Sequence, residues 1–211
     1  MHNHLKNELR NIISGKNQVR YGASIQAIAS YLINGETTSR SIESEKQFKE
    51  QEEKRLVNYI TKNGLWISDI DFSNYVSEGA EQKVYLKNSE SVFKLNDGIY
   101  YKFWVDYFHS LLLHNFFFAD TAYKLLGFTY ENEVLYAVVQ QSYVSITQVT
   151  DIENVKLFLK SNGFEIIRNN DYSNKELGII LEDLHDENVL TKDDTLYFID
   201  TVFYLTDDFW K

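Results

Sequence analysis

Near Trp66 the spacing of apolar residues changes, and this change restricts the chain to a mixed α+β fold. Before Trp66, apolar side chains recur every three or four residues, as they do in amphipathic helices. After it, short runs of Val, Tyr, Phe and Ile are separated by Gly, Asn and Asp, which is typical of strands and turns. We therefore predict an N-terminal helical segment over residues 1–66, followed by a domain over residues 67–211.

The same spacings predict the individual elements. In the first segment, helices are expected up to Ile13, over 24–33 and over 43–63. In the second, strands are expected over 83–87, 91–95, 123–130 and 134–144, the last two forming a hairpin through residues 131–133. Residues 100–118 are too apolar and too long for a strand and predict a buried helix, and another helix is expected over 152–161.

Composition excludes several kinds of site and partner. The chain of 211 residues contains no cysteine, which excludes disulfides, thiolate metal sites and cysteine nucleophiles. A formal net charge of −10 argues against general affinity for nucleic acid or for an anionic membrane. There is no signal-peptide pattern, and the most apolar stretch, 103–118, is shorter than the about 20 residues that cross a bilayer. We expect a soluble, cytoplasmic protein.

Lys94 occupies a strand position that should be buried. The run Ser91-Val92-Phe93-Lys94-Leu95 alternates in such a way that Val92 and Lys94 share one face. A buried ammonium group needs an anion, because an unpaired charge is costly to remove from water. The alternative is that the strand lies at a sheet edge and the lysine extends into water.

Three acidic or amide residues end apolar runs in the C-terminal third. Asp183 and Asn188 lie in the polar segment that separates the run 179–181 from Val189. Asp200 comes after the apolar run 196–199 and needs a donor or a cation, unless it only caps the next turn. A carboxylate and an amide that converge at the ends of buried elements can serve as a base and as a magnesium ligand.

Taken together, these residues resemble the protein-kinase-like phosphotransferases. In that superfamily a strand lysine holds the α and β phosphates of ATP, an Asp followed five residues later by Asn forms the catalytic loop, and a later Asp chelates Mg²⁺. Lys94, Asp183, Asn188 and Asp200 occur here in that order. The resemblance, over about 76–203, is greatest to the polyvalent kinase-like domains of phage and mobile-element proteins, and the segment 183–190 is also similar to the catalytic loop of aminoglycoside and choline kinases.

The resemblance gives roles to further residues, but one residue that the superfamily normally has is missing from this sequence. It implies that Gly79 and Glu81 form a shortened nucleotide-binding loop and that Gln140 lies in the hinge. It also implies that His185 neutralises the transferring phosphoryl group, the alternative being a solvent-exposed loop histidine. No glutamate occurs between Glu90 and Glu131, so the helix residue that normally pairs with the strand lysine is missing. Only Asp106 or Glu81 is placed to replace it.

The resemblance implies a minimal protein-kinase-like fold with a reduced C-terminal lobe, because the chain has only eleven residues after Asp200. It implies an ATP- and Mg²⁺-dependent phosphotransferase acting on a hydroxyl of a protein or small molecule. The alternative is a pseudokinase that binds a nucleotide or a protein without transfer. The sequence leaves the acceptor and the oligomeric state open.

The N-terminal helices have apolar faces that need a partner. We predict that these faces pack against the C-terminal half and cover the underside of the predicted catalytic loop. The residues expected to do so are Leu9, Ile12, Ile25, Ile28, Leu32, Leu56 and Ile60.

Overall fold

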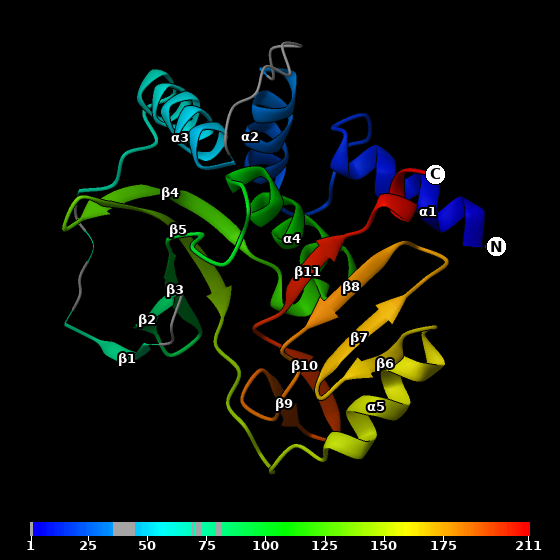
Figure 1. Ribbon diagram of the computed structural model, residues 1–211. Helices are drawn as coiled ribbons and strands as arrows, with labels where there is room; N and C mark the ends of the chain where they lie inside the picture. The colour runs from blue at the N-terminus through cyan, green and yellow to red at the C-terminus, as the bar shows by residue number, and fades with distance from the viewer. Residues whose placement is uncertain (1, 36–44, 69, 71–72, 79–81) are drawn as a thin grey trace.

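The computed structural model describes residues 2–35, 45–68, 70, 73–78 and 82–211 (Figure 1). The N-terminal segment contains three helices, as predicted. They are α1 (His2–Ile13), α2 (Ala23–Asn34) and α3 (Glu45–Lys62). The chain leaves the helical conformation after α3, so the N-terminal segment is helical to Lys62 and not to Trp66.

A five-stranded antiparallel sheet comes next. Its strands are β1 (Tyr75–Glu78), β2 (Gln82–Asn88), β3 (Ser91–Asn96), β4 (Lys124–Glu131) and β5 (Val134–Ser142), in the order β1-β2-β3-β5-β4. The predicted hairpin is confirmed as β4 and β5. Asn132 and Glu133 between them have φ values of 50° and 66°, which is the backbone of a two-residue turn that matches the twist of a hairpin.

The outer edge of β4 is covered by the chain that comes after α3. Leu65 O accepts a hydrogen bond of 2.9 Å from Phe128 N, and Ile67 N donates one of 2.8 Å to Phe128 O. Gly127 permits this approach, because a Cβ atom at that position would lie 2.3 Å from Leu65 O. The segment 65–67 therefore continues the sheet beyond β4 through backbone hydrogen bonds.

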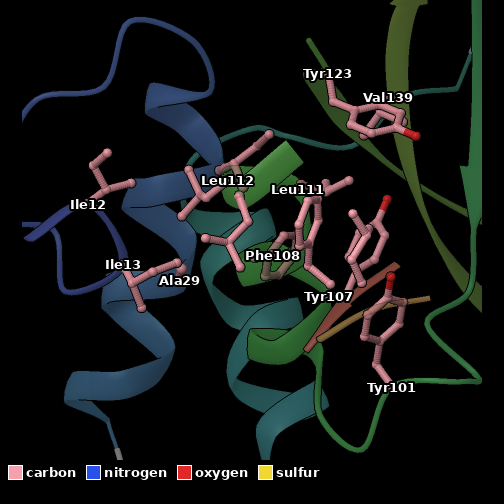
Figure 2. Packing of buried hydrophobic residues seen from close by; sticks show 14 of the residues in the cluster. Ile12, Ile13, Ala29, Tyr101, Tyr107, Phe108, Leu111, Leu112, Tyr123 and Val139 are labelled. Carbon is pink, nitrogen blue, oxygen red and sulfur yellow. The ribbon is translucent and has the colours of Figure 1, made fainter. Parts of the chain in front are cut away.

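The predicted apolar helix is α4 (Trp104–Phe117), which lies between this sheet and a second one (Figure 1). Its side chains are buried on more than one side, as a helix inside a core requires. Figure 2 shows Leu112 directed to Ile12 and Ala29 of the N-terminal helices, while Tyr107 and Leu111 lie toward Tyr123, which directly precedes β4, and Val139 of β5. Helix α4 thus connects the N-terminal helices to the sheet.

The C-terminal part contains six short strands that the sequence did not predict as a group. A four-stranded sheet has the order β11-β8-β7-β6, and a separate hairpin pairs β9 with β10. These strands are β6 (Glu165–Arg168), β7 (Asp171–Asn174), β8 (Ile179–Glu182), β9 (Val189–Lys192), β10 (Thr195–Phe198) and β11 (Val202–Leu205), preceded by α5 (Ile152–Ser161), which has the predicted bounds. Two short 3-10 helices, Ala119–Thr121 and Asp207–Trp210, complete the fold.

The apolar faces of the N-terminal helices are buried, as predicted. All seven predicted residues are at most 7% exposed, and they share one core with residues of both sheets. Their main partner is α4, however, and not the underside of the loop 183–188. Helix α1 reaches the C-terminal turn, where Lys6 Nζ and Arg10 Nε donate hydrogen bonds of 2.7 and 2.6 Å to the carbonyls of Asp208 and Phe209.

Among the described residues, no helix combines the length and the apolar composition that crossing a bilayer requires.

Candidate functional site

Lys94 lies in the middle of the first sheet, so the prediction of a buried lysine is confirmed and the edge-strand alternative is wrong. Strand β3 pairs with β2 on one side and β5 on the other. The Lys94 side chain is 4% exposed. Its Nζ donates to the carbonyl oxygen of Ile199 over 2.7 Å and lies 3.9 Å from Asp200 Oδ2. The buried ammonium group therefore has the anion that its position requires.

Asp200 lies between β10 and β11 and joins the two parts of the molecule. Its carboxylate also accepts a hydrogen bond from the Gln82 side-chain amide at the start of β2. The backbone N–H groups of Ile199 and Asp200 both donate to Asn188 O, over 3.0 and 3.4 Å. The end of the predicted catalytic loop is thus fixed directly beside Asp200.

The loop 183–188 brings Asp183, His185 and Asn188 into mutual contact. The Asn188 amide nitrogen donates to the Asp183 carbonyl over 2.8 Å and to Asp183 Oδ2 over 3.1 Å. His185 Nδ1 accepts from Glu187 N over 3.3 Å, and His185 Nε2 lies 3.4 Å from Asp183 Oδ1 and 3.1 Å from the Asn188 amide nitrogen. Asp183 has a φ of 63°, which Asp and Asn tolerate better than most other residues.

Asp183 is the more solvent-accessible carboxylate of the site. Its side chain is 62% exposed. Partial burial is the main cause that raises the pKa of Asp183, and the negative charge of Asp200 raises it further, while His185 and the Asn188 hydrogen bond lower it. The negative charge of Asp200 therefore disfavours ionisation of Asp183.

These residues fit a hard divalent cation. Asp200 offers carboxylate oxygens, and Asn188 has an amide oxygen once its nitrogen is committed to Asp183. A cation held by this all-oxygen set would relieve the repulsion between the carboxylates of Asp183 and Asp200. Backbone hydrogen bonds to Asn188 O bring Asn188 and Asp200 side by side.

Gln140 and Asp106 have contacts away from this cluster. Gln140 pairs with Phe93 in the register of β3 and β5, which directs its side chain to the sheet face opposite Lys94, where it accepts from Lys87 Nζ over 3.0 Å. The Asp106 carboxylate accepts from Phe103 N over 3.2 Å and so caps α4. Gly79 and Glu81 lie outside the described residues.

The sequence did not indicate a group of tyrosines behind Asp200. Tyr101, Tyr107 and Tyr123 line a small cavity together with Gln82 and Asp200, and Figure 2 shows the three rings on one side of α4. Tyr123 Oη donates to Ile199 O over 2.9 Å, and its ring lies under Lys94, with the ammonium 5.5 Å from the ring centre. Burial raises the pKa of Tyr123 well above its usual value, so the hydroxyl stays a neutral donor.

Comparison with known proteins gives one match. A family model described as serine/threonine/tyrosine kinase found in polyvalent proteins matches residues 49–207. The match begins inside α3 and includes both sheets and the residues around Lys94, Asp183 and Asp200. No curated protein and no solved structure matches the chain.

Proposed function

The chain belongs to the family of serine/threonine/tyrosine kinases found in polyvalent proteins, and from this we propose that it is an ATP- and Mg²⁺-dependent phosphotransferase. It would transfer the γ-phosphoryl group to a hydroxyl on a protein or a small molecule. The nucleotide and that hydroxyl-bearing acceptor are its proposed partners. The observation that carries the proposal is the contact of Lys94 with Asp200, because it unites a strand lysine and a metal-type carboxylate that are far apart in the sequence.

The architecture supports a minimal protein-kinase-like fold. The five-stranded sheet and α4 would form the nucleotide-binding lobe. The four-stranded sheet, the β9–β10 hairpin and α5 would form a reduced C-terminal lobe. After Asp200 the chain enters β11, which pairs with β8, so a sheet strand lies where a kinase would carry an activation segment.

The residues of the site have distinct proposed roles. Lys94, held by Ile199 O, would orient the phosphates. Asp183 would accept the proton of the acceptor hydroxyl, with His185 Nε2 beside it to balance charge. Asn188 and Asp200 would hold Mg²⁺, which when bound neutralises phosphate charge. Catalysis would then come from positioning and electrostatic stabilisation.

Two features favour the alternative of a non-catalytic pseudokinase. The Gln82 side-chain amide donates a hydrogen bond to the Asp200 carboxylate, to which a metal would bind. In addition, the described α4 contains no glutamate to pair with Lys94. A pseudokinase of this kind would bind a nucleotide or a protein without transferring a phosphoryl group.

Substitution of the two aspartates separates these possibilities. In Asp183→Asn the loop backbone should be preserved, because Asn tolerates the positive φ of this position. We expect loss of phosphoryl transfer by at least about a hundredfold with nucleotide affinity nearly unchanged. Asp200→Asn should weaken both. The exposed turn residue Asp193, whose φ is 48°, provides the control Asp193→Asn, which should change neither.

The assay is transfer of radiolabelled phosphate from ATP to the protein itself, to general protein acceptors and to small-molecule hydroxyls. Mg²⁺-dependent nucleotide binding by the wild-type protein without any transfer would favour the pseudokinase. An absence of nucleotide binding would refute the phosphotransferase and leave only a pseudokinase that binds a protein.

A further inference from the structure

Asp200 is held in place from both sides by residues of β3, of α4 and of the segment between α4 and β4. Before it, Phe198 O accepts a hydrogen bond from Thr121 Oγ1. Ile199 O accepts from Lys94 Nζ over 2.7 Å and from Tyr123 Oη over 2.9 Å. After it, the Thr201 hydroxyl lies 2.7 Å from His114 Nδ1 on α4.

The hydrogen bonds fix the state of His114. Its Nε2 lies 2.9 Å from Thr121 O, and a carbonyl can only accept, so Nε2 carries the proton. Nδ1 is then an acceptor, and Thr201 Oγ1 donates to it. Burial, together with the positive charge of Lys94, lowers the pKa of His114 to about 3, so the ring stays neutral across the physiological range.

This arrangement is fully buried. His114 is 0% exposed and Thr121 and Thr201 are at most 5% exposed. The distance and angle of a hydrogen bond between buried groups are strictly constrained. If the two groups move apart, the donor and the acceptor are left without a partner, because no water can take its place. Movement of the residue after Asp200 is therefore tied to the position of α4.

We propose that His114, acting through the Thr201 hydroxyl, is a positioning residue that orients the Asp200 carboxylate for cation binding. The helix would thus contribute to the site by holding the metal-binding aspartate, although it lacks the glutamate that would hold the lysine. This inference rests on the proposed function, because that function gives Asp200 the cation.

A purely structural role for the His114 and Thr201 pair makes a different prediction. If the pair only stabilised the core, its loss would lower the free energy of unfolding and leave cation affinity unchanged. If it positions Asp200, its loss also weakens the cation site. A buried threonine pair elsewhere separates the two: Thr150 Oγ1 lies 2.9 Å from Thr191 Oγ1, and both side chains are at most 8% exposed.

The experiment compares Thr201→Val, Thr201→Ser and Thr150→Val in the full chain. Valine has nearly the same shape as threonine without the hydroxyl, whereas serine restores it. The first measurement is the apparent Mg²⁺ dissociation constant at saturating ADP. We expect an increase of about fivefold for Thr201→Val, less than about twofold for Thr201→Ser, and no change for Thr150→Val.

The second measurement needs no ligand. Hydrogen exchange of the Ile199 and Asp200 amides, which donate to Asn188 O, should accelerate in Thr201→Val and not in Thr150→Val. Unchanged exchange and unchanged Mg²⁺ affinity in Thr201→Val would overturn the positioning role, as would equal weakening of Mg²⁺ binding by Thr150→Val. If the wild-type protein shows no Mg²⁺-dependent nucleotide binding, the proposed function fails, and the exchange rates alone decide whether His114 and Thr201 hold Asp200.

Discussion

Replacement of Glu52 by glutamine should change how the stability of the protein depends on pH. Glu52 lies on α3 and is 4% exposed. Its two carboxylate oxygens accept hydrogen bonds from Trp104 N over 2.7 Å and from Val105 N over 3.2 Å, so this side chain caps α4 from a neighbouring helix. Burial is the largest of the effects that raise the pKa of Glu52 from 4.5 to about 7.

The raised pKa of Glu52 determines both the direction and the size of the change in stability with pH. Between pH 4.5 and about 7 the folded protein binds the Glu52 proton more tightly than the unfolded chain does, so the free energy of unfolding falls as pH rises. The shift of the Glu52 pKa from 4.5 to about 7 corresponds to about 3 kcal/mol in the free energy of unfolding, at about 1.4 kcal/mol per pH unit. The contribution of Glu52 to the free energy of unfolding is fully present below the pKa that Glu52 has in the unfolded chain. It is lost once the pH rises above the pKa that Glu52 has in the folded protein.

Urea unfolding followed by tryptophan fluorescence at about pH 5.5 to 8 measures this contribution. Glu52→Gln is always neutral, so the free energy of unfolding of the wild type should fall relative to that of the variant by about 2 kcal/mol over this range. His109 and His114, whose burial lowers their pKa values to about 4 and about 3, are present in both proteins and cancel in the difference. The exposed Glu50→Gln is the control. Parallel pH profiles for wild type and Glu52→Gln would refute the reasoning.

Two further substitutions test the packing. Gly178→Ala should destabilise the protein by more than about 3 kcal/mol, because its φ is 72° and a Cβ atom there would lie 2.2 Å from Phe209 N. Gly64→Ala, at a φ of 62° with no atom within 4 Å of the Cβ position, should cost only about 1 kcal/mol, and equal losses in thermal unfolding would contradict the close-contact explanation. Leu9→Ala should lower the free energy of unfolding by about 2 to 4 kcal/mol, since Leu9 is 0% exposed in the shared core. A loss no larger than that of the exposed control Asn7→Ala would show that α1 is not part of the core.

Long elements were predictable from the sequence because their patterns repeat. Helices α1 to α5 and the β4–β5 hairpin each extend over enough residues for a period of 3.6 or 2 to be recognised. The second sheet was missed because its strands have four residues each. Strand β6 in addition exposes all four side chains, so it shows no alternation of buried and exposed positions.

The charged part of the site was predictable for an energetic reason. Lys94 and Asp200 each occupy a position that requires an opposite charge, and the structure pairs them. The residues that hold them were not predictable. In the sequence nothing distinguishes Tyr123, Thr121 and His114 from ordinary core residues. Only the fold brings their polar atoms to residues 198–201. Gln140 has its side chain on the sheet face opposite Lys94, and its place in a nucleotide hinge stays a prediction.

Segment 65–67 covers the outer edge of β4. Because this segment comes directly after α3, the stability of α3 affects the solubility of the first sheet. If α3 separates from α4, the segment after α3 loses its anchor, and the backbone N–H and C=O groups of β4 become available to another chain. Strand β4 is eight residues long and includes buried Leu125 and Phe128, a combination that favours intermolecular pairing once the edge is open. Substitutions that loosen α3 are therefore expected to cause aggregation before they cause global unfolding.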